Sequence, residues 1–183
     1  MKPALLALLL AAQQTGTAPV PVAVPQARAV AARAASSYAG IRLDGPDDFQ
    51  KATADALRLL EKSGDLPEVA AYVKKIKRAR CSGMEVYTGT FAVGDPTWKA
   101  SAVWYAGAIA HDSRHARLYR ESAASSGAEA ERKCLAFQLE VLERLGADAK
   151  TLAYVRELMK DPTYQNIGAQ GMRAEDVCDQ RQW

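Results

Sequence analysis

The chain has 183 residues, 49% hydrophobic and 25% charged, which is enough for one globular domain with a hydrophobic core. Its formal net charge of +3 is too small to indicate nucleic acid as a partner. The densest positive cluster runs from Lys74 to Arg80, and we interpret it as the solvated end of a helix. Nucleic-acid binding is therefore not expected.

The N-terminus has the features of a secretory signal. Lys2 precedes an almost wholly apolar run from Pro3 to Ala12, which is too short to cross a bilayer as a helix. We expect a signal peptide over residues 1–18 without a defined cleavage site, an Ala/Pro-rich linker over 19–44 and a single domain over 45–183. A buried amphipathic segment is the alternative for the first residues. The protein is thus expected to be exported, either periplasmic or secreted, with no membrane span once the signal is removed.

Apolar residues recur at helical spacing through most of the remaining chain. The predicted helices cover residues 46–62, 66–76, 98–121, 128–145 and 148–160. Gly64 suits the left-handed conformation that ends the first of them, and Asp148 is a good N-cap for the last. The tail from Thr163 is expected to be irregular.

Between Cys81 and Thr97 the periodicity changes to that of strands. Residues 84–88 and 90–93 are short β-prone runs on either side of Gly89, and they predict a hairpin or two edge strands. The expected fold is therefore mainly α, in the α+β class, a helical domain with a small β-hairpin or short sheet.

The chain has two histidines, His111 and His115, four residues apart within a predicted helix. Residues i and i+4 share a helix face, so both imidazoles could bind one metal ion. An acidic residue, Asp112, directly follows the first histidine. The alternative is an exposed helix face on which these polar residues form ordinary salt bridges.

A third ligand is expected on the next helix, because catalytic zinc usually has three protein ligands and a water. A short turn makes the two helices antiparallel, so the first turns of the second pass the histidines. Glu129 and Glu131 are both candidates there. They are two positions apart and point about 200° away from each other, so only one can face the metal.

This pattern resembles the gluzincin metallopeptidases, the thermolysin-like group, which have H-E-x-x-H on one helix and a glutamate ligand on the next. Here the first motif reads H-D-x-x-H, and the resemblance covers about residues 98–146. It implies that His111, His115 and Glu131 bind Zn²⁺ in a zincin-like helix pair. It also implies that Asp112 is the general base.

The same resemblance places Cys134 where these families often have a small residue, three positions after the glutamate. It further implies a substrate-binding strand beside the histidine helix, a role that we assign to Thr90–Val93. Tyr154 and Tyr164 are candidates for a hydrogen-bond donor to the oxyanion, although an ordinary structural tyrosine is the alternative for each.

The three cysteines, Cys81, Cys134 and Cys178, allow one disulfide and leave one thiol. Export makes a disulfide plausible, and we favour Cys178 as one partner. No P-loop, G-x-S-x-G elbow or dinucleotide fingerprint is present. The HD phosphohydrolases require further histidines, which this chain lacks.

Together these features predict an exported zinc-dependent hydrolase, a peptidase that acts on a peptide or protein substrate through zinc-activated water, with Asp112 as general base. The alternative is a non-enzymatic exported helical binding domain, or a degenerate zincin that retains metal without hydrolysis. The oligomeric state is left open.

Overall fold

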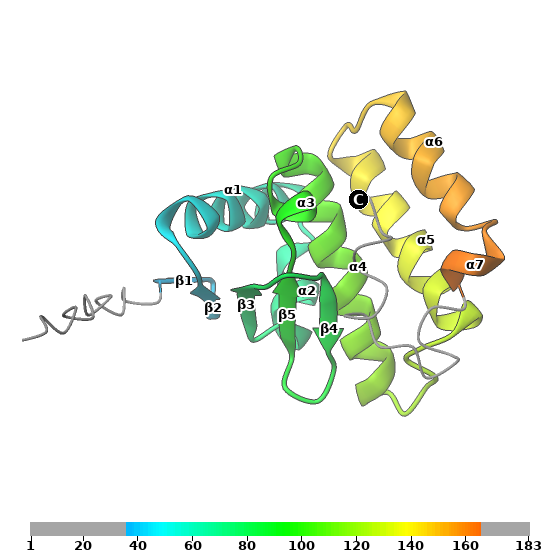
Figure 1. Cartoon of the computed structure of the whole chain (residues 1–183), viewed down its shortest axis with the longest axis horizontal. Coiled ribbons are helices and arrows are strands. Elements are labelled where there is room, and N and C mark those ends of the chain that lie inside the picture. Colours follow the sequence, from blue (N-terminus) through cyan, green and yellow to red (C-terminus); the bar gives the residue numbers. More distant parts are fainter. Residues whose placement is uncertain (1–35, 166–183) are drawn as a thin grey trace, which may run out of the picture. The chain divides into compact units, whose positions relative to one another are not determined.

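The computed structural model describes residues 36–165, except for the side chain of Thr163 (Figure 1). The expected signal peptide, its cleavage site, linker residues 19–35 and Cys178 lie outside the described residues. Within them, no helix is both long and apolar enough to cross a membrane.

Five short strands form one mixed sheet. They are β1 (Ser36–Tyr38), β2 (Ile41–Asp44), β3 (Lys75–Arg78), β4 (Gly83–Glu85) and β5 (Thr90–Val93). Their order across the sheet is β1-β2-β3-β5-β4. Strands β2, β3 and β5 run parallel, whereas β1 and β4 pair antiparallel with their neighbours and form the two edges.

Helices make up most of the described fold. They are α1 (Asp47–Ser63), α2 (Leu66–Tyr72), α3 (Asp95–Trp98), α4 (Ala102–Arg120), α5 (Ala128–Arg144), α6 (Ala149–Leu158) and α7 (Pro162–Gln165). The predicted class, mainly α with a small sheet, is confirmed. Two predicted helix boundaries are confirmed in detail: Gly64 ends α1 at φ 84°, and the Asp148 side chain accepts from the Thr151 amide at the start of α6.

The assignment of residues 36–44 to a linker is wrong, because they form the β1–β2 hairpin. Ala39 and Gly40 occupy its two-residue turn with φ of 48° and 80°, and Tyr38 pairs with Ile41 on either side. Positive φ at both central residues is characteristic of the tight turns whose twist matches that of paired strands. Ile41 and Leu43 then alternate with exposed residues and enter the core.

The predicted second helix also ends too late. It stops at Tyr72, and the basic cluster that follows belongs to β3 rather than to a helix end. Lys75, Ile76 and Lys77 alternate, so the isoleucine is fully buried while the lysines keep their ammonium groups near solvent and pair with acidic side chains. In a strand this segment buries only Ile76 and leaves its lysines at the surface. The helical spacing of apolar residues that we followed in the sequence does not predict this arrangement.

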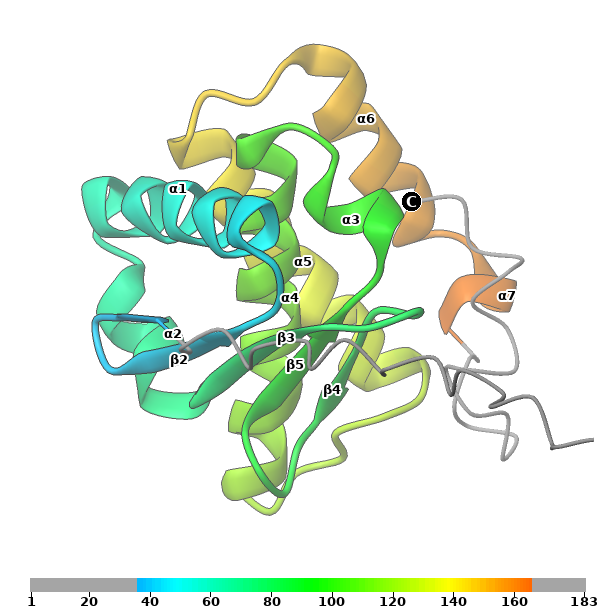
Figure 2. The ribbon, with the colours of Figure 1, turned by 60° about the vertical axis from the view of Figure 1, so that its left-hand side comes forward.

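The main hydrophobic core lies between the sheet and the helices α1, α2 and α4. Ile76 is in register with Leu43 on one side and Phe91 on the other, so these three side chains share one sheet face. Tyr105 and Ile109 of α4 pack into the same core. Figure 2 shows α4 alongside β4 and β5, with α5 beyond it. A second, smaller core lies among α5, α6 and α7.

Candidate metal centre

Helices α4 and α5 carry all the side chains of the predicted site and pack closely against each other. Ser101 caps α4 by accepting from the Trp104 amide. A Cβ added at Gly107 would lie 2.8 Å from Cδ2 of Leu142, which is fully buried. The absence of a side chain at this position therefore allows α5 to approach α4 one helical turn before the first histidine.

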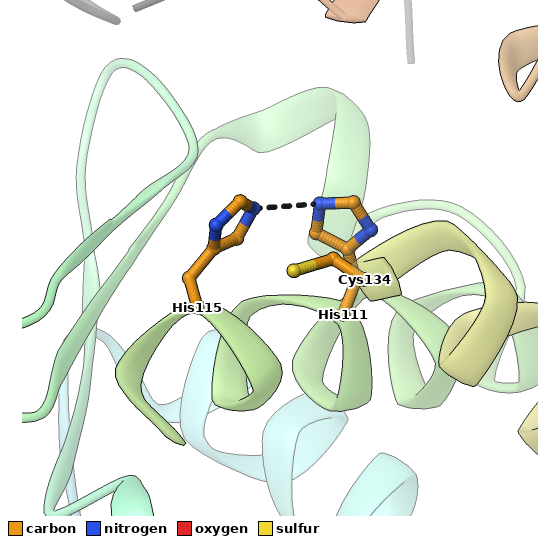
Figure 3. A group of neighbouring side chains, drawn as sticks. All are labelled: His111, His115 and Cys134. Atoms are coloured by element: carbon orange, nitrogen blue, oxygen red, sulfur yellow. Dashed lines mark hydrogen bonds between the residues drawn. The ribbon is translucent and has the colours of Figure 1, made fainter. Parts of the chain in front are cut away.

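His111 and His115 lie on one face of α4, as predicted, and both are more than nine-tenths buried. Their Nε2 atoms face each other at 3.2 Å (Figure 3). The Ser125 carbonyl in the α4–α5 turn lies 2.8 Å from His115 Nδ1. Because a carbonyl only accepts, this contact assigns the proton of a neutral His115 to Nδ1 and leaves the Nε2 lone pair for a metal.

The structure separates the two glutamates that the sequence left as rivals. Glu131 is buried at the histidines, with Oε2 3.4 Å from His111 Nε2 and Oε1 3.6 Å from His115 Nε2. Its Oε2 has no hydrogen-bond partner. Glu129 is exposed and pairs with Lys133 at 2.7 Å, four residues along the helix. Of the two glutamates, only Glu131 therefore lies where it could share a metal with the histidines.

The spacing of these donor atoms fits a small tetrahedral ion. Nitrogen and oxygen ligands bind zinc at about 2.0–2.2 Å, so the corners of the tetrahedron are about 3.3–3.6 Å apart. The two Nε2 atoms are 3.2 Å apart, Glu131 Oε2 lies 3.4 Å from His111 Nε2, and Glu131 Oε1 lies 3.6 Å from His115 Nε2, so each contact taken singly is close to this range. The donor types and their separations are thus both compatible with a small metal ion such as zinc.

Cys134, which was not among the ligands predicted from the sequence, completes a buried group with the two histidines. It follows Glu131 by three positions on α5, is fully buried and is a free thiol. Ligand atoms of His111, His115 and Cys134 all lie within 4.8 Å of one another. Figure 3 shows the sulfur pointing from α5 toward the imidazoles. These three residues could hold a metal ion. Cys134 lies three positions after Glu131 on α5, and this i,i+3 spacing is the signal that could have identified the cysteine from the sequence.

The buried side chains of Glu131 and Cys134 stabilise positive charge on the adjacent histidines, between α4 and α5. Burial raises the pKa of the Glu131 carboxyl, but the two adjacent histidines lower it more, and the result is well below the usual range. Burial lowers the pKa of His115, while Cys134 and Glu131 raise it well above its ordinary value. A metal cation can supply the same positive charge in place of a proton.

Asp112 is half-buried on α4. Burial raises the pKa of the Cys134 thiol, and the charges of Glu131 and Asp112 raise it further. The Asp112 carboxylate is thus close enough to act electrostatically on the buried group. Whether it is the base of a reaction stays a prediction.

Contacts with α2 hold α4 from another side. Arg114 and Arg117 both donate to Glu68, at 3.0 and 2.8 Å. The Arg114 guanidinium also lies 5.3 Å from the ring centre of Phe137 on α5. These contacts limit rotation of α4 about its axis and so fix the direction in which the two imidazoles point.

The two tyrosines proposed as oxyanion donors have structural contacts. Tyr154 on α6 packs against Trp104, with ring centres 5.7 Å apart. Tyr164 on α7 belongs to the smaller core with Leu135 and Val155. The role of either tyrosine as an oxyanion donor stays a prediction.

Among the cysteines, Cys81 is disulfide-bonded and Cys134 is free. The predicted disulfide is therefore present at Cys81, whereas the prediction for Cys178 lies outside the described residues.

No protein-family model, curated protein or solved structure matches this chain. The chemistry of the site therefore has to be inferred from its own side chains. Those side chains form a buried group on two packed helices that could hold a metal ion.

The placement of the two glutamates leads to a test of the third ligand. Glu131→Gln should weaken zinc binding by more than the roughly 10–100-fold that the loss of an outer-shell partner costs, because it removes a charged ligand. Glu129→Gln, the matched control, removes only an exposed ion pair and should leave affinity nearly unchanged. Competition with a chromogenic chelator measures both. Equal losses, or a larger loss for Glu129→Gln, would refute the assignment.

Proposed function

We propose that the protein is an exported zinc-dependent hydrolase, and specifically a peptidase. The observation that carries this proposal is the convergence of His111, His115 and Glu131, whose side-chain nitrogen and oxygen atoms contact one another at 3.2, 3.4 and 3.6 Å. Two imidazoles and one carboxylate are the ligand set of several zinc peptidases, in which a fourth position is left for water. The resemblance to gluzincins rests on the same three residues.

Zinc is favoured over other metals by the donor types. Imidazole nitrogen suits zinc, copper, iron and nickel, whereas sites for magnesium and calcium consist mainly of oxygen. The buried setting and the tetrahedral separations favour zinc among the first group. Zinc bound by these residues would supply Lewis-acid chemistry and lower the pKa of a water molecule toward about 7.

The proton transfers of hydrolysis are assigned to Asp112. As general base it accepts the proton of the attacking water and passes it to the leaving amine. Its place directly after His111 on α4 puts it one residue from a proposed ligand, as in the H-E-x-x-H helix.

The substrate strand needs a correction. Thr90–Val93 is β5, which pairs with β3 on one side and β4 on the other, so its backbone has no free edge for a peptide. The edge strand beside α4 is β4, Gly83–Glu85. We therefore assign the binding of an extended peptide to β4, which could add one strand to the sheet through main-chain hydrogen bonds.

A metal-binding domain without hydrolytic activity is the second candidate. It is favoured by the shorter side chain of Asp112 and by the buried thiol of Cys134 among the ligands. Protein purified with zinc and without chelator should be analysed for metal and incubated with a broad peptide library. If the protein binds zinc and cleaves peptides, the result supports the peptidase. If it binds zinc but neither the parent nor Asp112→Glu nor Cys134→Ser cleaves any peptide, the result supports the second candidate.

Export leads to a separate test. Mature protein from the native host should begin between Gln13 and about Ser36 and be found outside the cytoplasm. Because β1 begins at Ser36, every start in this window leaves the sheet whole. The disulfide at Cys81 is in keeping with an oxidising compartment. N-terminal sequencing of fractionated cells provides the measurement, and soluble cytoplasmic protein that retains Met1 would contradict export.

A further inference from the structure

The metal centre proposed above contains more donors than an open catalytic site needs. His111, His115 and Glu131 already supply the usual three protein ligands. Cys134 adds a fourth from α5, and its sulfur lies within 4.8 Å of the histidine ligand atoms. Structural zinc sites are closed by four protein ligands, whereas catalytic sites keep one position open. The identity of the fourth ligand therefore decides what the site can do.

Burial makes Cys134 a natural fourth ligand. The residue is fully buried in a small apolar cluster with Leu118 and Ala130, yet its sulfur points at the imidazoles rather than into that cluster alone (Figure 3). Zinc–nitrogen and zinc–sulfur bonds of about 2.0–2.1 and 2.3 Å put the two ligand atoms about 3.6 Å apart. The three ligand atoms lie within 4.8 Å of one another, so an approach of at most about 1.2 Å would bring the sulfur to that separation from each imidazole.

Charge balance favours the thiolate as well. A divalent ion held by two neutral imidazoles and the Glu131 carboxylate leaves one net positive charge in a buried site. Uncompensated buried charge is costly, and a thiolate from Cys134 cancels it. Oε2 of Glu131 is buried without a hydrogen bond and has only the 3.4 Å ion-pair contact with His111 Nε2, so a bound cation would satisfy it better than the protein alone does.

We propose that Cys134 is the fourth protein ligand and closes the position that hydrolysis requires. This inference rests on the proposed function, because it concerns the same metal. For water to enter, the sulfur–metal bond breaks, one water oxygen takes the vacated position and the thiolate takes up one proton from solvent. No electrons are transferred, so the exchange needs neither an oxidant nor a reductant.

Cobalt(II) ions provide the test, because a thiolate bound to cobalt gives an intense near-ultraviolet charge-transfer absorption that nitrogen and oxygen ligands do not. The parent chain loaded with one equivalent of cobalt should show this absorption. Cys134→Ser should bind cobalt without it, since a serine hydroxyl is a poor ligand and remains protonated. Ala130→Ser is the matched control, as it adds a hydroxyl to the same buried cluster and should retain the absorption.

If the Cys134 thiolate fills the fourth position about nine-tenths of the time, about one parent molecule in ten can bind the water. Zinc-loaded Cys134→Ser should then hydrolyse peptides at least about tenfold faster than the parent. Circular dichroism confirms that each variant is folded. If variant and parent hydrolyse at equal rates, the thiol does not close the position.

The outcomes separate the two proposals. One bound equivalent of cobalt without charge-transfer absorption in the parent overturns the role of Cys134 and leaves the peptidase in place. The absorption without hydrolysis by either form overturns the peptidase and supports a closed metal centre. If no cobalt binds, both proposals are wrong.

Discussion

His111→Ala is expected to reduce the zinc content of the purified protein from about one equivalent to less than about a tenth. The imidazole supplies one of three ligands from the proposed set, and its Nε2 lies 3.2 Å from that of His115 and 3.4 Å from the Glu131 carboxylate. Alanine leaves no donor in its place. Elemental analysis of protein purified with zinc present and never exposed to chelator gives the measurement.

Ser113→Ala is the matched control for this substitution. Ser113 is buried on the same helix, but its hydroxyl donates to the Ala110 carbonyl, and two positions along a helix point it away from the histidines. The control should retain about one equivalent of zinc. If the parent itself holds less than about a tenth of an equivalent, the proposed zinc site is wrong.

Asp112→Asn is expected to retain zinc while lowering hydrolytic activity by about 100-fold or more, because it removes the proposed proton acceptor without removing a ligand. Aspartate and glutamate have similar pKa values, so proton affinity does not exclude Asp112 as a base. Its side chain is shorter by one methylene, about 1.5 Å of reach, and a base must come within about 2.6–3.2 Å of its water or act through one further water. Asp112→Glu should therefore retain or raise activity.

Steady-state peptide hydrolysis and metal analysis should be run together on these variants, in the parent and in the Cys134→Ser background. Asp55→Asn is the matched control, because Asp55 forms exposed ion pairs on α1. Cleavage by Asp112→Asn at the parental rate would show that another group is the base. Inertness of the parent, Cys134→Ser and Asp112→Glu alike would favour the non-hydrolytic domain.

The sequence predicted the helices better than the sheet, for a physical reason. The long runs that became α1, α4, α5 and α6 extend their helical pattern over several turns, and the capping residues Gly64 and Asp148 mark the end of α1 and the start of α6. In strands of three or four residues, the alternation of buried and exposed side chains repeats only once or twice. The hairpin turn at Ala39–Gly40 was missed because alanine is an unusual residue at positive φ.

The candidate site was predictable where one helix placed its residues and less so where two helices met. The i,i+4 spacing fixes His111 and His115 on one face whatever the rest of the fold. The choice between Glu129 and Glu131 required the rotation of α5 about its axis, which tertiary packing determines. The contact of Ser125 with His115 depends on the path of the turn, which helical periodicity does not encode.

The close contact of Gly107 with Leu142 has a consequence for how metal affinity can change. The proposed ligands are divided between two helices, so their affinity for a metal would depend on the spacing of α4 and α5 as well as on the donors themselves. An added methyl at position 107 would push the helices apart and pull the carboxylate and thiol away from the imidazoles, although no donor has changed. Conversely, a bound ion would hold α4 and α5 together at the contact of Gly107 with Leu142. Helix spacing and the affinity of the proposed metal centre are therefore coupled, and residues outside the ligand set, such as Gly107, would change both.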